Sequence, residues 1–357
     1  MPDFIPGLEL SRLFYQEVVA PLLSQKYPNL KFSAALIGSG SEVLGFDTPM
    51  SSDHDWGPRA LLFLSEEDYA AYQGEIDTLF RKELPAEFRG YPTDFHYPPS
   101  PPSSEIDHRI TIWTLRRYFL DALGTDIQNE IQPTDWLTFP EQILRTAVEG
   151  AVFRDDIGLQ AIRDKFAYFP NDIWLYLLAA GWTRIGQEEH LMGRAGYVGD
   201  EIGSALIAAR LVRDLMRLCF LMEKQYAPYP KWFGTAFSRL SCAEALSAVL
   251  KQILTAETWQ EREGHLVSAY EQVAEKHNAL GITDPLPTKS KLFFDRPFQV
   301  VHLHGDFTGA ICARIASPEI KYLAERRLIG SVDQFCDSTD LLCDGERLIQ
   351  LRSLYTG

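Results

Sequence analysis

The chain has 357 residues, which is more than one hydrophobic core of ordinary size accommodates, so we expect two lobes. A formal net charge of -15 argues against a broad electrostatic interaction with nucleic acid, because such binding depends on clustered Lys and Arg. No stretch reaches the roughly 20 apolar residues that span a bilayer, and the first residues do not form a signal peptide. We therefore expect a soluble cytoplasmic protein with neither a membrane nor nucleic acid as its partner.

The first part of the chain mixes helical and strand patterns. In chain order we predict a helix over 8–25, strands over 32–38 and 60–64, a helix over 66–84, strands over 89–97 and 109–114, and a helix over 115–123. Gly124 follows the last of these helices directly, as is common where a helix ends. Residues 1–135 are therefore predicted to form a small α/β domain with a mixed sheet.

From about residue 140 the strand patterns give way to long helical ones. The predicted helices cover 141–151, 156–166, 171–189, 200–225, 243–254 and 258–278, with at least one more between 300 and 330. The sequence thus predicts an α+β protein in which residues 136–357 form an all-helical bundle domain. We expect that domain to provide the second wall of an active-site cleft.

The cysteines are widely spaced and form neither a CxxC pair nor a zinc-ligand pattern. We expect buried free thiols, which agrees with a reducing compartment. The five residues are Cys219, Cys242, Cys312, Cys336 and Cys343.

The segment between the first two predicted strands has the composition of a phosphate and metal site. Gly40 and Ser41 offer backbone N–H groups and a hydroxyl that can approach phosphate oxygens closely. Asp53 and Asp55 are two residues apart, so on an extended segment their carboxylates lie on the same side. Mg²⁺ prefers oxygen ligands and commonly takes one or two protein carboxylates, with phosphate and water completing its shell. We therefore predict that these residues bind a nucleoside triphosphate and two Mg²⁺ ions, with the two aspartates as metal ligands.

The order and spacing of these residues resemble the polymerase-beta-like nucleotidyltransferase superfamily, in which Gly-Ser precedes Asp-x-Asp by roughly ten residues. The longer strings Gly-Ser-Gly-Ser-Glu and Asp-His-Asp-Trp-Gly-Pro-Arg are similar to a bacterial and fungal group of nucleotidyltransferase-like proteins. The resemblance implies a nucleotidyltransferase-type mixed sheet and in-line transfer of a nucleoside monophosphate to a hydroxyl, with Asp53 and Asp55 as catalytic residues.

The superfamily usually completes its site with a third acid on a later strand. Asp94, within the strand predicted over 89–97, lies at the matching place, although Pro92 weakens that strand and Asp107 is the alternative. We predict that Asp94 is the third catalytic residue and holds the incoming nucleophile.

In the helical lobe, Arg210, Arg213 and Arg217 lie three and four residues apart on one helix face. Arginine suits bidentate contact with phosphate, so Arg210 is a candidate nucleotide-binding residue, with an internal ion-pair network as the alternative explanation. Lys231, in an aromatic loop, is a second candidate for the triphosphate, and packing between helices is the alternative there.

Two further features of this lobe have both a functional and a structural interpretation. Glu201, near the start of the predicted helix over 200–225, could act as a base, as an acid from the second domain does in related antibiotic-modifying nucleotidyltransferases. His302 and His304 have the residue type of metal ligands, but no further ligands lie nearby in the sequence, which favours a structural pair.

Two functions fit these residues. The first is a Mg²⁺-dependent nucleotidyltransferase that uses a nucleoside triphosphate and an unidentified small-molecule or protein hydroxyl. The second is a non-catalytic nucleotide-binding or toxin–antitoxin-type interaction module on the same fold. Polymerisation or tailing of nucleic acid is disfavoured by the acidic charge.

Overall fold

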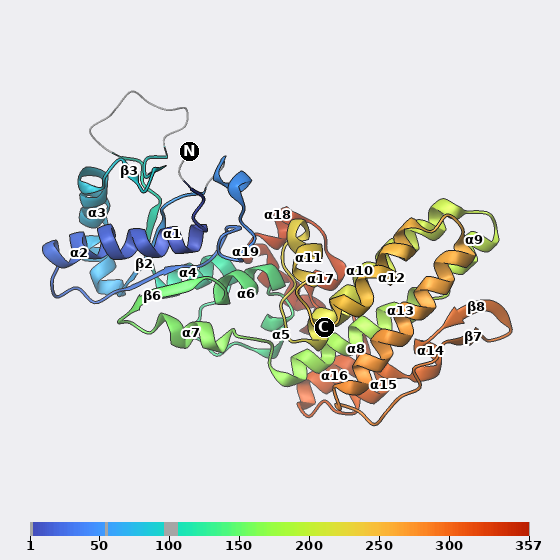
Figure 1. The fold of residues 1–357 in the computed structure, drawn as a ribbon. Coiled ribbons are helices and arrows are strands. Elements are labelled where there is room, and N and C mark those ends of the chain that lie inside the picture. Colours follow the sequence, from blue (N-terminus) through green and yellow to red (C-terminus); the bar gives the residue numbers. More distant parts are fainter. Residues whose placement is uncertain (1–2, 54–55, 96–105, 357) are drawn as a thin grey trace. The chain divides into compact units, whose positions relative to one another are not determined.

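The computed structural model describes residues 3–53, 56–95 and 106–356, without the side chains of residues 52 and 53, and every statement below concerns this part of the chain. The chain divides into two units (Figure 1). The first unit comprises Met1–Glu130, Ile143–Ala167 and Cys343–Ile349, and the second comprises Ile131–Gln142, Tyr168–Leu342 and Gln350–Gly357. The first unit thus includes two segments that follow residue 135 in the sequence.

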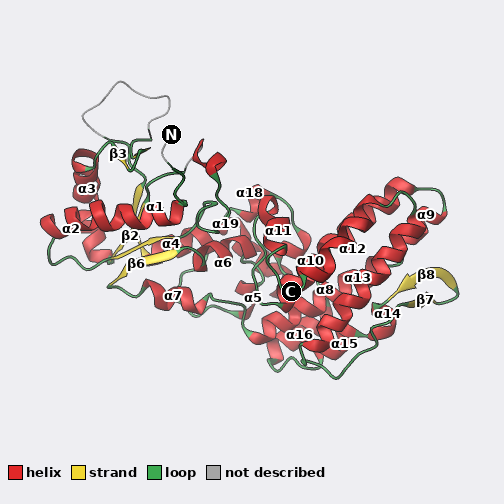
Figure 2. Ribbon diagram, in the orientation of Figure 1, coloured by secondary structure: helices red, strands yellow, loops and turns green. Residues whose placement is uncertain are grey.

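A four-stranded mixed sheet organises the first unit (Figure 2). Its strands are β1 (Ser33–Leu36), β2 (Ala60–Leu64), β5 (Ile110–Thr114) and β6 (Ala151–Asp155), in the order β5-β2-β1-β6. β1 is antiparallel to β2 and β6, whereas β2 and β5 are parallel. The predicted N-terminal mixed sheet is confirmed.

The helices of the first unit surround this sheet. They are α1 (Gly7–Phe14), a π-helical segment (Tyr15–Val19), α2 (Ala20–Lys26), α3 (Glu66–Glu83), α4 (Leu115–Leu123), most of α6 (Glu141–Val148), α7 (Leu159–Lys165) and α19 (Gly345–Leu348). Helix α3 begins after Ser65, whose hydroxyl accepts the N–H of Asp68 at 3.0 Å. Helix α4 ends at Gly124, which has a φ of 67°, as its sequence predicts.

Different helices cover the two faces of the sheet. Leu62 of β2 belongs to the core that includes Phe14 of α1 and Phe80 of α3. The next residue, Phe63, points to the other face and packs edge to face on Tyr118 of α4, with ring centroids 5.4 Å apart. On the α4 side of the sheet, Phe63 is therefore part of the packed core. Toward the start of β2, the same side of the sheet lines a cavity.

Two predictions for this unit are wrong. The strand predicted over 89–97 is wrong for the described residues 89–95, because Arg89 and Gly90 both have positive φ and make the turn of a short hairpin, β3 (Glu87–Phe88) and β4 (Tyr91–Pro92); residues 96 and 97 lie outside the described residues. The strand patterns also do not stop before residue 140, since β6 follows α6. β6 has no clear alternation of its own and is a strand because it pairs with β1.

The second unit is largely helical, as predicted. Its helices are α5 (Pro133–Trp136), α8 (Asn171–Glu188), α9 (Leu191–Tyr197), α10 (Glu201–Met222), α11 (Pro230–Phe237), α12 (Ala243–Thr255), α13 (Trp259–Ala279), α14 (His302–Gly305), α15 (Phe307–Cys312), α16 (Pro318–Arg326), α17 (Val332–Phe335), α18 (Thr339–Leu342), a 3-10 turn (Ile349–Arg352) and α20 (Ser353–Thr356). The expectation of an all-helical domain is nevertheless wrong, because β7 (Lys291–Phe293) and β8 (Arg296–Val300) form an antiparallel hairpin.

Helix α10 packs against α8, α9, α12 and α13, while α8 also packs against α15. A Cβ added at Gly181 would lie 2.7 Å from a side-chain carbon of Leu218 on α10, so glycine allows the close approach of these two helices. Trp182 stacks on Phe307 with ring centroids 4.1 Å apart, which fixes α15 against α8. Within the described ranges, no helix is both long and apolar enough to cross a bilayer.

Candidate functional site

The turn that follows β1 requires a glycine at position 40. Gly40 has a φ of 143°, and a Cβ there would lie 2.2 Å from a guanidinium nitrogen of Arg59 and 2.7 Å from a carboxylate oxygen of Glu42. No side chain fits in that space. The turn predicted from Gly40 and Ser41 is therefore present, and its backbone lies directly against an ion pair.

That ion pair joins the turn to the start of β2. The Nε atom of Arg59 donates to Glu42 at 2.7 Å, and a second nitrogen donates to the backbone carbonyl of Ser39 at 2.5 Å. Glu42 is buried, whereas 22% of the Arg59 side chain remains exposed. Because a bidentate guanidinium is rigid and retains further N–H donors, Arg59 holds the turn in place and still presents hydrogen-bond donors to solvent.

A second arginine lies beside Arg59 on the neighbouring strand. β2 and β5 are parallel with Ala60 opposite Ile110, so the preceding residues, Arg59 and Arg109, are also neighbours across the strands. The backbone confirms this register, because Ala60 N–H donates to the carbonyl of Arg109 at 3.3 Å. The Arg109 guanidinium lies over the ring of Phe95, 4.9 Å from its centroid.

A cavity of about 340 Å³ opens between the turn and these strands. Its lining includes Ser39, Gly40, Arg59, Leu61, Arg109 and Thr111. Among the lining residues that the structure describes, the charged side chains are the two arginines, which can contact an anion. In the sequence, Arg59 ends the longer motif without a predicted role, and Arg109 is only the first residue of a predicted strand. An arginine immediately before each of two apolar strands was the available signal.

Asp53 does not lie on an extended segment. It is the last residue of a 3-10 helix (Pro49–Asp53), so the strand assumed for the Asp-x-Asp pair is wrong at this residue, and the argument from alternating side chains fails there. Asp55 and the side chain of Asp53 are outside the described residues. Their assignment as metal ligands stays a prediction.

The two alternative third acids occupy adjacent segments before β5. A carboxylate oxygen of Asp94 accepts the N–H of Asp107 at 3.0 Å, and the N–H of Phe95 donates to the carbonyl of Asp107 at 2.9 Å. Asp94 lies after the β3–β4 hairpin, not within a strand. Its carboxylate therefore shapes the approach to β5, and the choice between Asp94 and Asp107 as a catalytic acid stays open.

Asp47 is a structural residue of this segment that the sequence did not single out. Its carboxylate accepts the N–H of Gly7 at 2.7 Å and the indole N–H of Trp56 at 3.1 Å. Trp56 in turn stacks on Phe4 and packs against Tyr91. These contacts fix both ends of the loop that carries Asp53, because a charged hydrogen bond and a buried indole hold it to the N-terminal segment.

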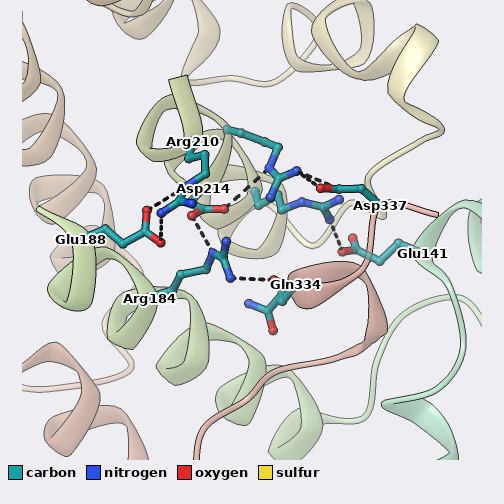
Figure 3. A network of polar contacts seen from close by, with 9 residues as sticks. Glu141, Arg184, Glu188, Arg210, Asp214, Gln334 and Asp337 are labelled. Carbon is teal, nitrogen blue, oxygen red and sulfur yellow. Dashed lines mark hydrogen bonds and ion pairs between the residues drawn. The ribbon is translucent and has the colours of Figure 1, made fainter. Parts of the chain in front are cut away.

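The arginine stripe of α10 lies in the second unit and forms a polar network (Figure 3). Arg210 donates to Glu188 of α8 at 3.0 Å, and one nitrogen of Arg213 donates to both carboxylate oxygens of Asp337, at 2.7 and 2.8 Å. The Arg213 contact lowers the pKa of Asp337. These two arginines therefore have acidic partners within their own unit.

The remaining members of the network are more buried. Arg217 donates to Glu141 at 3.3 Å, and Arg184 of α8 donates to Asp214 at 2.7 Å and to the backbone carbonyl of Gln334 at 3.0 Å (Figure 3). Burial raises the pKa of Asp214 even though Arg184 acts in the opposite direction. The contacts match the ion-pair explanation of the stripe, while nucleotide binding by Arg210 stays a prediction.

Lys231 and Glu201 have different surroundings. Lys231 lies exposed in the first turn of α11, with its ammonium 4.8 Å from the ring centroid of Trp232. Glu201 accepts hydrogen bonds from Arg262 at 3.0 Å and from the N–H of Trp259 at 3.1 Å, at the start of α13. Glu201 thus joins α10 to α13, whereas a contact of Lys231 with a triphosphate stays a prediction.

His302 and His304 do not share a ligand position. The Nε2 of His302 is 2.7 Å from the Thr308 hydroxyl, and that of His304 is 3.0 Å from the carbonyl of Leu292. In the part of the chain that the structure describes, no group of three His, Cys, Asp or Glu residues could hold a metal ion. These separate partners fit the structural interpretation of the histidine pair.

All five cysteines are free, as predicted, but their expected burial is wrong for most of them. Cys219 is buried and Cys343 is exposed, while the other three are partly exposed. The exposed thiol lies in the short turn between α18 and α19.

Comparison with known proteins gives a match to a family and a similarity to a solved structure. Residues 136–233 match DUF4037, a domain of unknown function, and this segment includes all of α8 and α10 and the arginine stripe. The chain is also similar to a nucleotidyltransferase-like protein from Exiguobacterium sibiricum 255-15, with 10% identity, a TM-score of 0.33 and coverage of 77% of each chain. No curated protein matches the chain.

Proposed function

We propose that this protein is a Mg²⁺-dependent nucleotidyltransferase that moves a nucleoside monophosphate from a nucleoside triphosphate to a hydroxyl of a small molecule or a protein. The observation that supports it best is the glycine turn after β1, which lies against Arg59 and opens into a cavity beside β2. The segment between this turn and β2 carries Asp53 and Asp55, in the order that the nucleotidyltransferase superfamily uses.

Each part of this segment suits one part of the substrate. The Gly40 turn lies against the Arg59 guanidinium, so a phosphate oxygen at this turn would also meet that cation, and the Ser41 hydroxyl can donate to the same group. Asp53 and Asp55 would hold Mg²⁺, since carboxylate oxygens are its preferred protein ligands, and the bound ion would neutralise triphosphate charge. Asp94 or Asp107 would hold the attacking hydroxyl.

Pyrophosphate release tests this function. Wild-type protein with a nucleoside triphosphate, Mg²⁺ and a panel of small-molecule and protein hydroxyl acceptors is expected to release pyrophosphate. Asp53→Asn is expected to lower the rate by at least about 100-fold, because it removes a metal-ligand charge. Glu67→Gln, an exposed acid on α3 in the same unit, is the matched control and should leave the rate unchanged. The proposal fails if calorimetry shows no Mg²⁺-dependent triphosphate binding and Asp53→Asn changes nothing.

A non-catalytic nucleotide-binding module is the second candidate. One observation favours it: alternate residues on β5 share a face, and the positions on the same side as Arg109 are Thr111 and Trp113, neither of which is an acid. A third carboxylate would then have to come from outside that strand. Tight triphosphate binding without pyrophosphate release across the acceptor panel would support this candidate, and steady release would exclude it.

A further inference from the structure

Helix α10 carries an apolar face that lies exposed over about two turns. The residues of this α10 face are three and four positions apart, so they share one side of the helix, and all of them are exposed: Ile202, Ala205, Leu206 and Ala209. Ile202 is 77% exposed and Leu206 is 65% exposed. The other side of the same turns is packed inside the unit. A helix that is apolar all round is normally buried all round, yet the described residues of its own unit leave the α10 face uncovered.

Exposed apolar residues also end the preceding helix, α9. Tyr197 is 65% exposed and Val198, directly after α9, is 78% exposed. The Tyr197 ring packs edge to face on Trp259 and Phe298, with centroids 6.4 and 6.0 Å away, which restrains its position. Restrained aromatic side chains and contiguous exposed apolar residues are typical of surfaces that bind another protein.

Opposite charges lie at the two ends of the α10 face, while the face itself has no ionisable side chain. Asp200 precedes the face and is exposed. Arg210 follows it with 52% of its side chain exposed, whereas its partner Glu188 is only 14% exposed, so the guanidinium is the group that solvent reaches. Asp200 and Arg210 are each five residues from Ala205. The charge pattern along this helix is therefore complementary to its own reverse.

We propose that the α10 face is a dimer interface, in which the helices of two copies of this chain pack antiparallel with Ala205 near the two-fold axis. In this arrangement Asp200 of each copy lies beside Arg210 of the other, since a two-fold interface pairs one surface with itself. The small side chain of Ala205 allows the helices to approach, and Ile202 and Leu206 of each copy pack across the axis. Copies with a net charge of -15 repel one another, and a face without acids lets them meet where that repulsion is weakest.

Sedimentation velocity of the full chain over a concentration series tests the interface. The wild type is expected to dimerise reversibly with a dissociation constant in the micromolar range. Ala205→Lys places a long cationic side chain from each copy at the axis and should weaken the dimer at least about 10-fold. Ala71→Lys is the matched control, because Ala71 is an exposed alanine within α3 of the first unit, and this variant should dimerise as the wild type does.

Asp200→Asn tests the antiparallel orientation. The Asp200 side chain accepts the N–H of Gly203 at 2.7 Å, and asparagine keeps an acceptor for this helix cap while it removes the charge. In the antiparallel dimer each Arg210 then loses an acidic partner, so the dimer should weaken about two- to five-fold. In a parallel dimer the two Asp200 carboxylates would face each other, and the same change would strengthen association.

Three results would overturn the proposal. They are a wild-type protein that stays monomeric up to about 100 µM, wild-type affinity in Ala205→Lys whose circular dichroism shows a folded chain, and stronger association of Asp200→Asn. Should Ala205→Lys fail to fold, Leu206→Gln that dimerises as tightly as the wild type would overturn the proposal instead. These measurements need neither a nucleotide nor a metal, so their outcome is independent of the proposed transfer.

Discussion

Glu189, at the C-terminal end of α8, should make the stability of the second unit fall as pH rises. Its buried carboxyl accepts the N–H groups of Val301 at 2.7 Å, His302 at 3.2 Å and Leu303 at 3.3 Å. Burial raises its pKa from the ordinary 4.5 to about 7, although these hydrogen bonds act in the opposite direction. The folded protein therefore favours the neutral carboxyl, and the unfolded chain ionises it more readily.

The size of the effect follows from the two pKa values. Raising a pKa from 4.5 to about 7 corresponds to about 3.4 kcal/mol at 1.36 kcal/mol per unit. Because the folded-state pKa is the higher one, the contribution is fully present below pH 4.5 and is lost as pH rises through about 7. Between pH 5 and pH 8 the loss is about 2.5 kcal/mol. The glutamine of Glu189→Gln does not titrate. The free energy of unfolding of this variant, compared with wild type, should therefore be more favourable at pH 8 than at pH 5 by that amount.

Urea denaturation at pH 5 and pH 8 measures this difference directly. Glu223→Gln is the control, because Lys276 and backbone N–H groups near Cys242 lower the pKa of Glu223 to about 2, and both states are then largely ionised throughout this range. The free energy of unfolding that Glu223→Gln removes should be the same at both pH values. If Glu189→Gln changes the free energy of unfolding by the same amount at pH 5 and at pH 8, the buried carboxyl is already charged at pH 5, and the reasoning is refuted.

Two further predictions concern a turn and a histidine. Gly124→Ala should lower stability by about 2 to 4 kcal/mol, because the residue has a φ of 67° and its Cβ would lie 2.0 Å from the carbonyl oxygen of Gly345. Gly158→Ala, also at positive φ but with open space around it, should cost only about 1 kcal/mol in the same thermal melts, and equal costs would contradict the clash. Burial lowers the pKa of His277 from 6.5 to about 4, so its contribution to stability is present above pH 6.5 and lost as pH falls through 4. NMR titration should find this imidazole neutral at pH 5, and a midpoint near 6.5 would be incompatible with its burial.

The sequence predicted those elements whose signals are local. The helix of α4 has its N-cap at Thr114 and its stop at Gly124, and both work through contacts a few residues away. β5 alternates buried and exposed residues, so its period was visible in the letters. The largely helical second unit followed from long apolar periodicity in the same way.

The strand and the site residues that the sequence did not predict depend on partners far away in the chain. β6 is a strand because Ala151 and its neighbours pair with β1, more than 100 residues earlier, and nothing local distinguishes it from a loop between helices. In the candidate site, Gly40 was found because glycine has a local reason to occur in a tight turn. Arg59 and Arg109 were missed because their proximity comes from the parallel register of β2 and β5, which the sequence does not state.

The division of the first unit into separate chain segments has a consequence during synthesis. β1 leaves the ribosome well before β6, so one edge of β1 stays open until the fourth strand arrives, and open edges invite pairing between chains. The Gly124–Gly345 contact forms only after the intervening Tyr168–Leu342 segment has been translated. A fragment that ends at residue 135 should therefore aggregate. The first unit is expected to complete its folding late in translation, after the helical segment that interrupts it in the sequence has been synthesised.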